Sequence, residues 1–471
     1  MKYFCLATLS LLCISVSHCA EIHLAQGLLS GEPTHDSVIL QSRLTAVAQP
    51  IDRKIPGSRG VGRFEISAMA NFSSSTFSEW LSATPENDFI LKAKMAALNP
   101  STIYYYRLIY GKDQSHTKPS STASSKTLPA PSTIAPMHFI VTSCLNYSFF
   151  QESAKNQDSA TSQDRILGYP ALESIHHCKP DFVIFNGDCV YYDHPAQTRA
   201  KSQGELRQKW HEQYAMPRFP KIFAQTPTFW LKDDHDYRFN DSDPKGNQQP
   251  SHELGIATFR EQVPVIDPKA PDSPTYRTHR ITKDLQLWFV EGRDYRSENR
   301  MPDGPTKSLW GITQRNWLQQ SIKNSKATYK MIISPTPMIG PDDGYKSDNH
   351  ANLKGFHHEA QSFFEWLISN NIDPKKFFLL CGDRHWKYHS IHPLGFTEFS
   401  CGALNRENAR LGRKPGDPQS NDPAGKIRQP YTDQQPSGGF LRVSLETTPS
   451  TSLKFFHHDD QGKILHQFTA P

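Results

Sequence analysis

The sequence predicts a layered α/β fold preceded by a small all-β sandwich of the immunoglobulin or fibronectin kind. From Glu21 to about Pro129, apolar and polar residues alternate as in half-exposed strands, and no helical period stands out. From Met137 onward, short apolar runs alternate with amphipathic segments, which is the pattern of strands connected by helices. We therefore expect a β-sandwich domain over residues 21–129 and a larger α/β domain over residues 130–471.

Three stretches of the first part carry its predicted strands. Ser37–Leu44 and Gly62–Ala68 alternate apolar and polar residues, which predicts strands that are exposed on one face. Leu98–Tyr110 begins with turn residues and continues as an aromatic-rich strand. His116–Pro136 is rich in Ser, Thr and Pro, so we expect a linker or an exposed connection there.

The larger part alternates between strands and helices. Gly168–Cys178 and Glu359–Ser369 have apolar residues at steps of three and four, as amphipathic helices do. Asn405–Gly439 is poor in apolar residues and predicts a long loop. The predicted strands of the α/β domain are His138–Thr142, Phe182–Asn186, Thr228–Leu231, Leu285–Val290, Lys330–Ser334 and Phe377–Cys381, followed by two closing strands, Gly439–Leu445 and Leu453–Phe456.

The N-terminal residues have the pattern of an export signal. A basic Lys2 is followed by the apolar segment 3–16 and then by small residues up to Ala20. This pattern predicts a signal peptide over residues 1–20 and a secreted or periplasmic product. Lipid anchoring through Cys19 is the less favoured alternative, because His18 stands directly before that cysteine. No later segment is long and apolar enough to predict a membrane span.

Charge and cysteine content narrow the function classes. The formal net charge of +5 is mild for 471 residues and no block of Lys and Arg stands out. We therefore expect no nucleic-acid-binding surface, although a slight positive charge suits an anionic ligand. The sequence leaves the oligomeric state unknown. Five cysteines remain after the predicted signal: Cys144, Cys178, Cys189, Cys381 and Cys401. An odd number predicts at least one unpaired thiol, and one of the five is a candidate metal ligand.

Polar and metal-ligating side chains follow four of the predicted strands. Taken singly, each has an ordinary explanation: Asp188 suits a helix cap, and a lone His235 is more often structural than catalytic. Together they are costly at the ends of buried strands unless a cation neutralises them. The edge where strands leave an open α/β sheet is also where ligands bind. We therefore expect a metal site where the ends of four predicted strands meet, namely 142–146, 186–191, 230–236 and 380–385.

The motifs at these strand ends resemble those of the PhoD-type alkaline phosphatases, a branch of the calcineurin-like metallophosphoesterases that includes relatives of the purple acid phosphatases. The resemblance spans nearly the whole chain after residue 20, and it implies the metallophosphoesterase α/β sandwich as the fold of the larger domain. The motifs that carry it are Ser143-Cys144, Gly187-Asp188-Cys-Val-Tyr191, Asp233-Asp234-His235-Asp236 and Gly382-Asp383-Arg384-His385.

The resemblance implies a centre of two metal ions with Asp188 as the bridge. Thiolate and phenolate donors suit Fe3+, and oxygen donors suit Ca2+. The first strand lacks the Asp-x-His of ordinary superfamily members, so a pair of other divalent ions such as Zn2+ or Mn2+ is the alternative and not the expectation. The further ligands implied are Cys144, Tyr191 and His385 for Fe3+, and Asp234 and Asp383 for Ca2+.

The activity implied is hydrolysis of phosphate esters, as in an alkaline phosphatase or a phosphodiesterase. Two ions would lower the pKa of a bound water, and the resulting hydroxide would attack phosphorus in line. Beside Asp188, the candidate catalytic residues are His235, as the general acid for the leaving group, and Arg384. Arg384 is a candidate clamp on a phosphate oxygen, with a solvated or structural arginine as the alternative.

Two further hypotheses stay open from the sequence. The substrate is a small-molecule or a polymeric phosphate ester, and a phospholipase-D-like enzyme acting on polymeric or lipid phosphodiesters is the alternative within the same class. An alternative of another class is a non-catalytic surface- or carbohydrate-binding protein whose β module binds while the α/β domain is inert. Competent residues at every implied ligand position argue against that second alternative.

Overall fold

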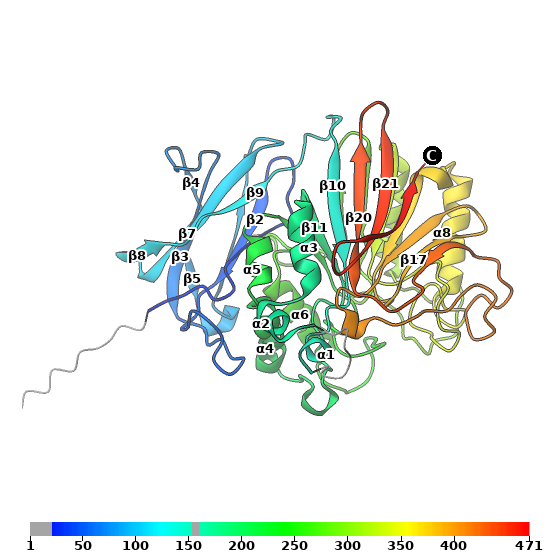
Figure 1. The fold of residues 1–471 in the computed structure, drawn as a ribbon, viewed down its shortest axis with the longest axis horizontal. Coiled ribbons are helices and arrows are strands. Elements are labelled where there is room, and N and C mark those ends of the chain that lie inside the picture. The colour runs from blue at the N-terminus through cyan, green and yellow to red at the C-terminus, as the bar shows by residue number, and fades with distance from the viewer. Residues whose placement is uncertain (1–20, 153–159, 471) are drawn as a thin grey trace, which may run out of the picture.

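The computed structural model describes residues 21–152 and 160–470 (Figure 1). It confirms the predicted fold class, with an all-β N-terminal region next to an α/β body. The predicted signal peptide over residues 1–20 lies outside the described residues. Among the residues that the structure describes, no helix combines the length and the apolar character that crossing a bilayer requires.

One large mixed sheet runs through both parts of the molecule. Its centre is parallel: β10 pairs with β11, and β11 pairs with β12. The sheet continues from β12 into β1, where Gly31 pairs with Thr228. This pairing joins parts of the chain that lie on either side of residue 129, the predicted domain boundary. In spatial order its strands are β22 (Ile464–Thr469), β21 (Ser452–Asp459), β20 (Gly439–Glu446), β10 (Met137–Thr142), β11 (Phe182–Asn186), β12 (Thr228–Leu231), β1 (Leu28–Gly31), β2 (Val38–Arg43) and β6 (Ile90–Met95).

A second sheet packs on the first, and a third completes the N-terminal sandwich. The second contains β13 (Arg277–Arg280), β14 (Leu285–Phe289), β15 (Tyr329–Ser334), β16 (Phe377–Cys381), β18 (Thr397–Cys401), β17 (Lys387–Ile391) and β19 (Arg428–Thr432). The third contains β4 (Thr76–Phe77), β3 (Gly60–Ser67), β7 (Ile103–Asp113) and β8 (His116–Pro119), with β5 (Leu81–Ala83) and β9 (Ala123–Lys126) at its sides.

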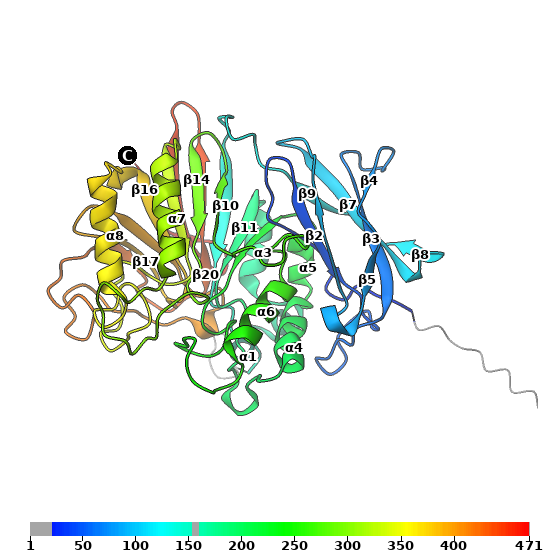
Figure 2. The same ribbon diagram turned by 180° about the vertical axis from the view of Figure 1, so that it is seen from behind.

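The helices cover the outer faces of the two large sheets. Figure 1 shows α3 and α5 beside the first sheet, and Figure 2 shows α7 and α8 beside the second. The α-helices are α1 (Tyr147–Glu152), α2 (Ser162–Leu167), α3 (Pro170–Cys178), α4 (Gln203–Tyr214), α5 (Arg218–Phe223), α6 (His252–Gln262), α7 (Gly311–Asn324) and α8 (His357–Ser369), and the short 3-10 helices are η1 (Pro85–Asn87), η2 (Ala196–Thr198), η3 (Pro374–Lys376) and η4 (Arg406–Asn408).

Two apolar layers explain why the central strands are continuous apolar runs. Successive side chains of a strand point to opposite faces, so a strand with both faces covered needs apolar residues throughout. Phe182 and Phe229 point into the layer between the two sheets, where the Phe229 ring lies 5.0 Å from that of Phe289. Phe185 and Trp230 point the other way, into the layer under the helices, and stack at 4.1 Å.

Two details of the N-terminal region differ from the expectation. β2 is buried at every position and not half-exposed, because the α/β body covers its second face: Gln41 donates from Nε2 to the carbonyl of Gln262 at 2.6 Å. The expected linker 116–136 contains the two strands β8 and β9, both paired with β7. The division of the chain at residue 129 stays a prediction.

A buried ionic network joins the N-terminal region to α4. The guanidinium of Arg43 lies 3.1 Å from Asp88, whose second oxygen lies 2.5 Å from Nε2 of His211 and 2.8 Å from Nε2 of Gln262. Burial by itself would raise the pKa of Asp88, but the hydrogen bond from His211 and the charges of His211 and Arg43 outweigh burial and hold that pKa below its ordinary value. Asp88 is therefore an anion that bonds both the Arg43 guanidinium and the His211 imidazole, although burial and the charge of Arg43 lower the pKa of His211.

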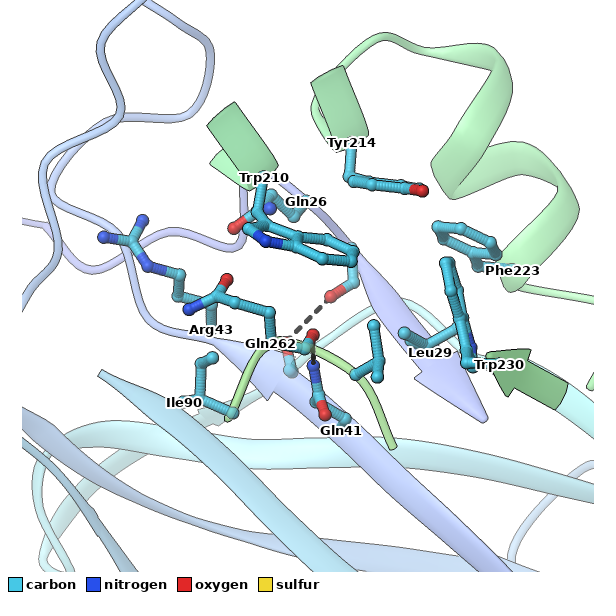
Figure 3. Close-up of a pocket in the computed structure, with 13 residues that line it drawn as sticks. Gln26, Leu29, Gln41, Arg43, Ile90, Trp210, Tyr214, Phe223, Trp230 and Gln262 are labelled. Atoms are coloured by element: carbon cyan, nitrogen blue, oxygen red, sulfur yellow. Dashed lines mark hydrogen bonds between the residues drawn. The ribbon is translucent and has the colours of Figure 1, made fainter. Parts of the chain in front are cut away.

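A small cavity adjoins this network (Figure 3). Its volume is about 50 Å³, which is room for a few water molecules. Trp210 and Tyr214 of α4 form one wall. The buried side-chain oxygens of Gln26 and Gln41, which also line it, have no hydrogen-bond donor among the described residues, as expected where water supplies the donor.

Replacing Asp88 tests this junction. In Asp88→Ala the buried Arg43 and His211 lose their shared anion, so we expect the free energy of unfolding to fall by about 3–5 kcal/mol. Urea unfolding at neutral pH measures it. The exposed Glu86, two residues away, provides the control: Glu86→Ala should unfold like the wild type. Equal stability of Asp88→Ala and Glu86→Ala would contradict the role given to the network.

Candidate metal centre

The four predicted strand ends meet at one point of the structure. β10, β11 and β12 run parallel, so the segments that follow them leave the first sheet at the same edge, and β16 delivers Asp383 and His385 from the second sheet. Asp188 follows β11, Asp234 follows β12 and Cys144 follows β10. These residues are buried, with exposed fractions between 0% and 7% for Cys144, Asp188, Asp234 and Asp383.

The backbone turns sharply at three of these residues. Cys144, Asp188 and Asp383 have φ values of 58°, 53° and 57°, a left-handed conformation that residues other than glycine rarely adopt. Such strain persists where the surrounding structure imposes it, and it collects at functional sites. Gly187 precedes Asp188 with φ 82°, and a Cβ there would lie 2.7 Å from Cβ of Asp233, so only glycine fits. The turn aims the next side chain into the cluster.

The distances define three groups of potential ligands that share Asp188, and the ligand atoms in each group lie within 4.8 Å of one another. The first is Cys144, Asp188 and His385, and the second is the four carboxylates of Asp188, Asp233, Asp234 and Asp383. The third joins Asp188 and Asp234 to His235. A residue common to all three groups is placed where a ligand shared by two ions would lie. The phenol of Tyr191 donates to Oδ2 of Asp188 at 3.1 Å, so all six residues expected at the metal site lie in one cluster.

The donor atoms in the cluster fit a pair of cations. Buried oxygens of Asp188, Asp233 and Asp234 have no hydrogen-bond partner among the described residues, although burying such groups is costly unless they are paired. A thiol, a phenol and an imidazole surround Asp188 on one side, a donor set for a transition metal. Mainly carboxylates surround it on the other, a set for a hard divalent ion, and His235 also lies within 4.8 Å of Asp188 and Asp234 there. A cation at each place would satisfy these atoms.

Burial and mutual repulsion raise the pKa of Asp188, whereas at Asp234 the charges of His235 and Arg293 outweigh burial and lower the pKa. Burial, with the nearby charges of Asp234, Asp236 and Asp383, raises the pKa of Asp188 well above its ordinary value, although His235 opposes this. Burial and then Asp188 likewise raise the pKa of the Cys144 thiol and of the Tyr191 phenol. A bound cation inverts this balance, because it favours the deprotonated ligands.

His235 is held beside the cluster by a carboxylate and a ring. Its Nδ1 lies 2.7 Å from Oδ1 of Asp193, and its ring stacks on Tyr191 with the centroids 4.1 Å apart. Burial lowers the pKa of His235, but Asp193, Asp234 and Asp188 outweigh burial and raise it well above the ordinary value. His235 is therefore a proton carrier with a fixed orientation, and Asp193 sets that orientation.

His385 differs from His235 in its charge. Burial, and then the charges of Arg410 and Arg384, lower the pKa of His385 well below its ordinary value, so the imidazole is neutral and can ligate a metal. The neighbouring Arg384 is buried, and its guanidinium bonds the carboxylates of Asp342 and Asp383. This contact favours the structural alternative for Arg384 over the phosphate clamp.

Three residues of the site carried no signal in the sequence. Asn408 donates from Nδ2 to the Tyr191 phenol oxygen and to the carbonyl of Cys144, both at 3.0 Å. Arg293 is fully buried and donates from Nε to Asp233 at 2.7 Å. Asp193 is the partner of His235 described above. None of the three ends a predicted strand, so neither hydrophobic period nor ligand spacing could identify them. All five cysteines of the described residues are free, as expected for a chain without a disulfide framework.

Comparisons with known proteins agree with the geometry. The sequence model of the PhoD-like phosphatase family matches residues 139–434, and that of the PhoD-like phosphatase N-terminal domain matches residues 14–129. Alkaline phosphatase D of Bacillus subtilis (strain 168) is 23% identical over 416 residues, which cover 79% of this chain and 66% of the length of that relative.

Two solved structures share the fold. The structure of PhoD superposes with a TM-score of 0.74 at 19% identity, covering 95% of this chain and 90% of that one. A purple acid phosphatase from yellow lupin (Lupinus luteus) seeds superposes with a TM-score of 0.62 at 12% identity, covering 94% of this chain and 73% of that one. Both likenesses show the same arrangement of sheets over nearly the whole chain.

The bridge position gives a test that needs no substrate. Burial raises the pKa of Asp188, so without metal the wild type at neutral pH must take up a proton there on folding, and Asp188→Asn avoids this cost. We therefore expect the metal-free variant to be more stable than the wild type by roughly 1–3 kcal/mol. With metal the order should reverse, because the variant lacks the shared ligand. Urea unfolding after chelation and after metal addition, with elemental analysis, measures both effects.

The surface residue Asp272 provides the control, since Asp272→Asn should change neither quantity. If Asp188→Asn keeps the wild-type metal content and metal-dependent stabilisation, Asp188 is not the bridge.

Proposed function

This chain belongs to the PhoD-like phosphatase family, and from that premise we propose that it hydrolyses phosphate esters at the cluster around Asp188. The observation that supports the proposal most directly is that Asp188 lies within 4.8 Å of a sulfur- and nitrogen-containing group and of an all-carboxylate group at once. That arrangement suits two adjacent cations of different character. Burying unpaired acidic groups costs free energy, and a non-catalytic binding protein would gain nothing that offsets this cost.

The metals proposed are Fe3+ and Ca2+, with two other divalent ions such as Zn2+ or Mn2+ as the alternative. Fe3+ would take the thiol, phenol and imidazole side, and Ca2+ the carboxylate side. When bound, such ions supply Lewis acidity toward the phosphoryl oxygens and an activated water molecule. The residues proposed to hold them are Cys144, Tyr191 and His385 for Fe3+, Asp234 and Asp383 for Ca2+, and Asp188 for both.

The side chains around the cluster divide the remaining work. His235 carries a proton next to the site and is the proposed general acid, which gives that proton to the leaving alkoxide. Asp193 and the Tyr191 ring fix the imidazole, so the proton is held at one place. Asn408 donates a hydrogen bond to the Tyr191 phenol oxygen, and that phenol in turn donates to Asp188. Because the Arg384 guanidinium bonds two carboxylates, we propose no phosphate contact for it.

The substrate class is the open part of the proposal. Hydrolysis of p-nitrophenyl phosphate and of bis(p-nitrophenyl) phosphate, after metal supplementation, separates a phosphomonoesterase from a phosphodiesterase. Activity on neither ester would favour the non-catalytic alternative. We also propose that the protein is exported to the periplasm or the cell exterior, which rests on the composition of residues 1–20.

Replacing His235 tests the general acid. His235→Ala should lower kcat for an alkyl phosphate, which has a poor leaving group, by about 10²–10⁴-fold, and should affect p-nitrophenyl phosphate far less. Steady-state kinetics on the two esters measures the difference. His177 on α3 provides the control, since its side chain is exposed and His177→Ala should leave both rates unchanged. An equal loss on both esters in His235→Ala would contradict the general-acid role.

Replacing Tyr191 tests the iron ligand. A phenolate bound to Fe3+ gives a visible charge-transfer band, so the purified protein should be coloured and Tyr191→Phe should lose the band. Absorption spectroscopy of the metal-loaded proteins measures it. Tyr192 is the matched control, because its buried phenol accepts from Trp210 and faces away from the cluster, so Tyr192→Phe should stay coloured. A colourless, fully active wild type that contains only zinc would contradict the iron assignment.

A further inference from the structure

A segment of the expected loop 405–439 lies along the metal centre. At Asn408 it bonds Tyr191, one of the proposed ligands. Two residues later the backbone N–H of Arg410 donates to the carbonyl of His385, another proposed ligand, at 3.1 Å. At Gly412 it passes so close to Trp386 that a Cβ would lie 1.9 Å from the indole ring. Three contacts, to Tyr191, His385 and Trp386, therefore fix the segment 408–413 at the edge of the candidate metal centre, which we call its rim.

The side chain of Arg410 is placed differently from the other arginines of this rim. Its guanidinium lies over the indole ring of Trp386, 4.4 Å from the centroid, and its side chain is 43% exposed. Within the described part of the chain, its hydrogen-bonding partner is one oxygen of Asp343, at 3.3 Å. Arg384, in contrast, is 1% exposed and bonded to two carboxylates. Arg410 thus keeps donors directed to solvent next to the centre.

Asp343 does not require Arg410 as its partner. Arg413 donates from Nε to the other oxygen of Asp343 at the shorter distance of 2.7 Å, and it also contacts Asp417 at 3.3 Å. The carboxylate therefore keeps a tighter partner if Arg410 turns away. A guanidinium that already lies over an aromatic ring loses little conformational freedom when it binds an anion. This placement favours binding of an anion by Arg410.

We propose that Arg410 binds a second phosphate of the substrate, so that the preferred substrates carry another phosphate group close to the one that is cleaved. The proposal rests on the proposed phosphoesterase function and names the substrate class of that site. The planar guanidinium presents a fork of N–H donors that matches two oxygens of a phosphate. A polymer of phosphodiesters and a small bisphosphate both offer such a group.

Two glycerol phosphates provide the kinetic test. Glycerol 1,3-bisphosphate carries the second phosphate and glycerol 1-phosphate lacks it, so we expect the wild type to have the higher kcat/KM on the bisphosphate. Arg410→Gln should lower kcat/KM for the bisphosphate by about 10–100-fold and leave the monophosphate within a factor of two, because a charge-assisted contact is lost for one substrate alone. Arg413→Gln removes the same charge from the same segment and should keep the preference.

A binding measurement keeps the outcome independent of catalysis. Methylenediphosphonate and methylphosphonate are not cleaved as esters, and titration calorimetry on the metal-loaded protein should give a tighter Kd for methylenediphosphonate, with the difference lost in Arg410→Gln. Equal binding of the two compounds by the wild type would overturn the proposal. An equal loss for both compounds in Arg410→Gln would also overturn it, since Arg410 would then hold the reacting phosphate or the site itself. If the wild type binds both as expected but hydrolyses no ester, the proposed function fails and the subsite stands.

Discussion

The crowding of acidic groups at the ends of four buried strands is the constraint on which the structure depends. Asp188, Asp234 and Asp383 would repel one another in a dry cavity, and the thiol of Cys144 and the phenol of Tyr191 add two more acidic groups. Left-handed backbone at three of these residues adds a further cost. Under the proposed function, bound cations would offset this repulsion, which would link metal binding to folding.

The N-terminal region is connected to that centre through α4. Asp88 bonds His211 in the last turn of this helix, and two and three residues later Gln213 and Tyr214 donate to the carbonyl of Cys189, which follows Asp188. The loop that carries Asp188 is therefore supported by a helix that the N-terminal region anchors. A continuous sheet from β12 to β6 makes the same connection through the backbone. The N-terminal region therefore helps to hold the loop that carries Asp188 in place.

The segment around Arg410 lies beside a buried centre whose candidate ligands come from other parts of the chain. Those candidates follow β10, β11, β12 and β16, so the two large sheets set their positions. Asn408 and Arg410 belong to the connection between β18 and β19, yet they lie against Tyr191 and His385. Under the proposed function, the strand ends would hold the metals and this connection would set the substrate preference.

The sequence by itself predicted the fold class, the central strands and six candidate ligands that the fold brings together, because apolar period and ligand type are local properties and each candidate comes shortly after a strand. It did not predict the burial of β2, the strands within 116–136, or the helix η4 and strand β19 within the expected loop 405–439, since these depend on what packs against them. Asp193 and Arg293 reach the centre from loops and Asn408 from η4, and only tertiary structure brought them there. Arg384 shows the same limit: its neighbours suggested a phosphate contact, and the fold placed two carboxylates beside it. A residue's partners are decided by packing across the chain, which no local pattern encodes.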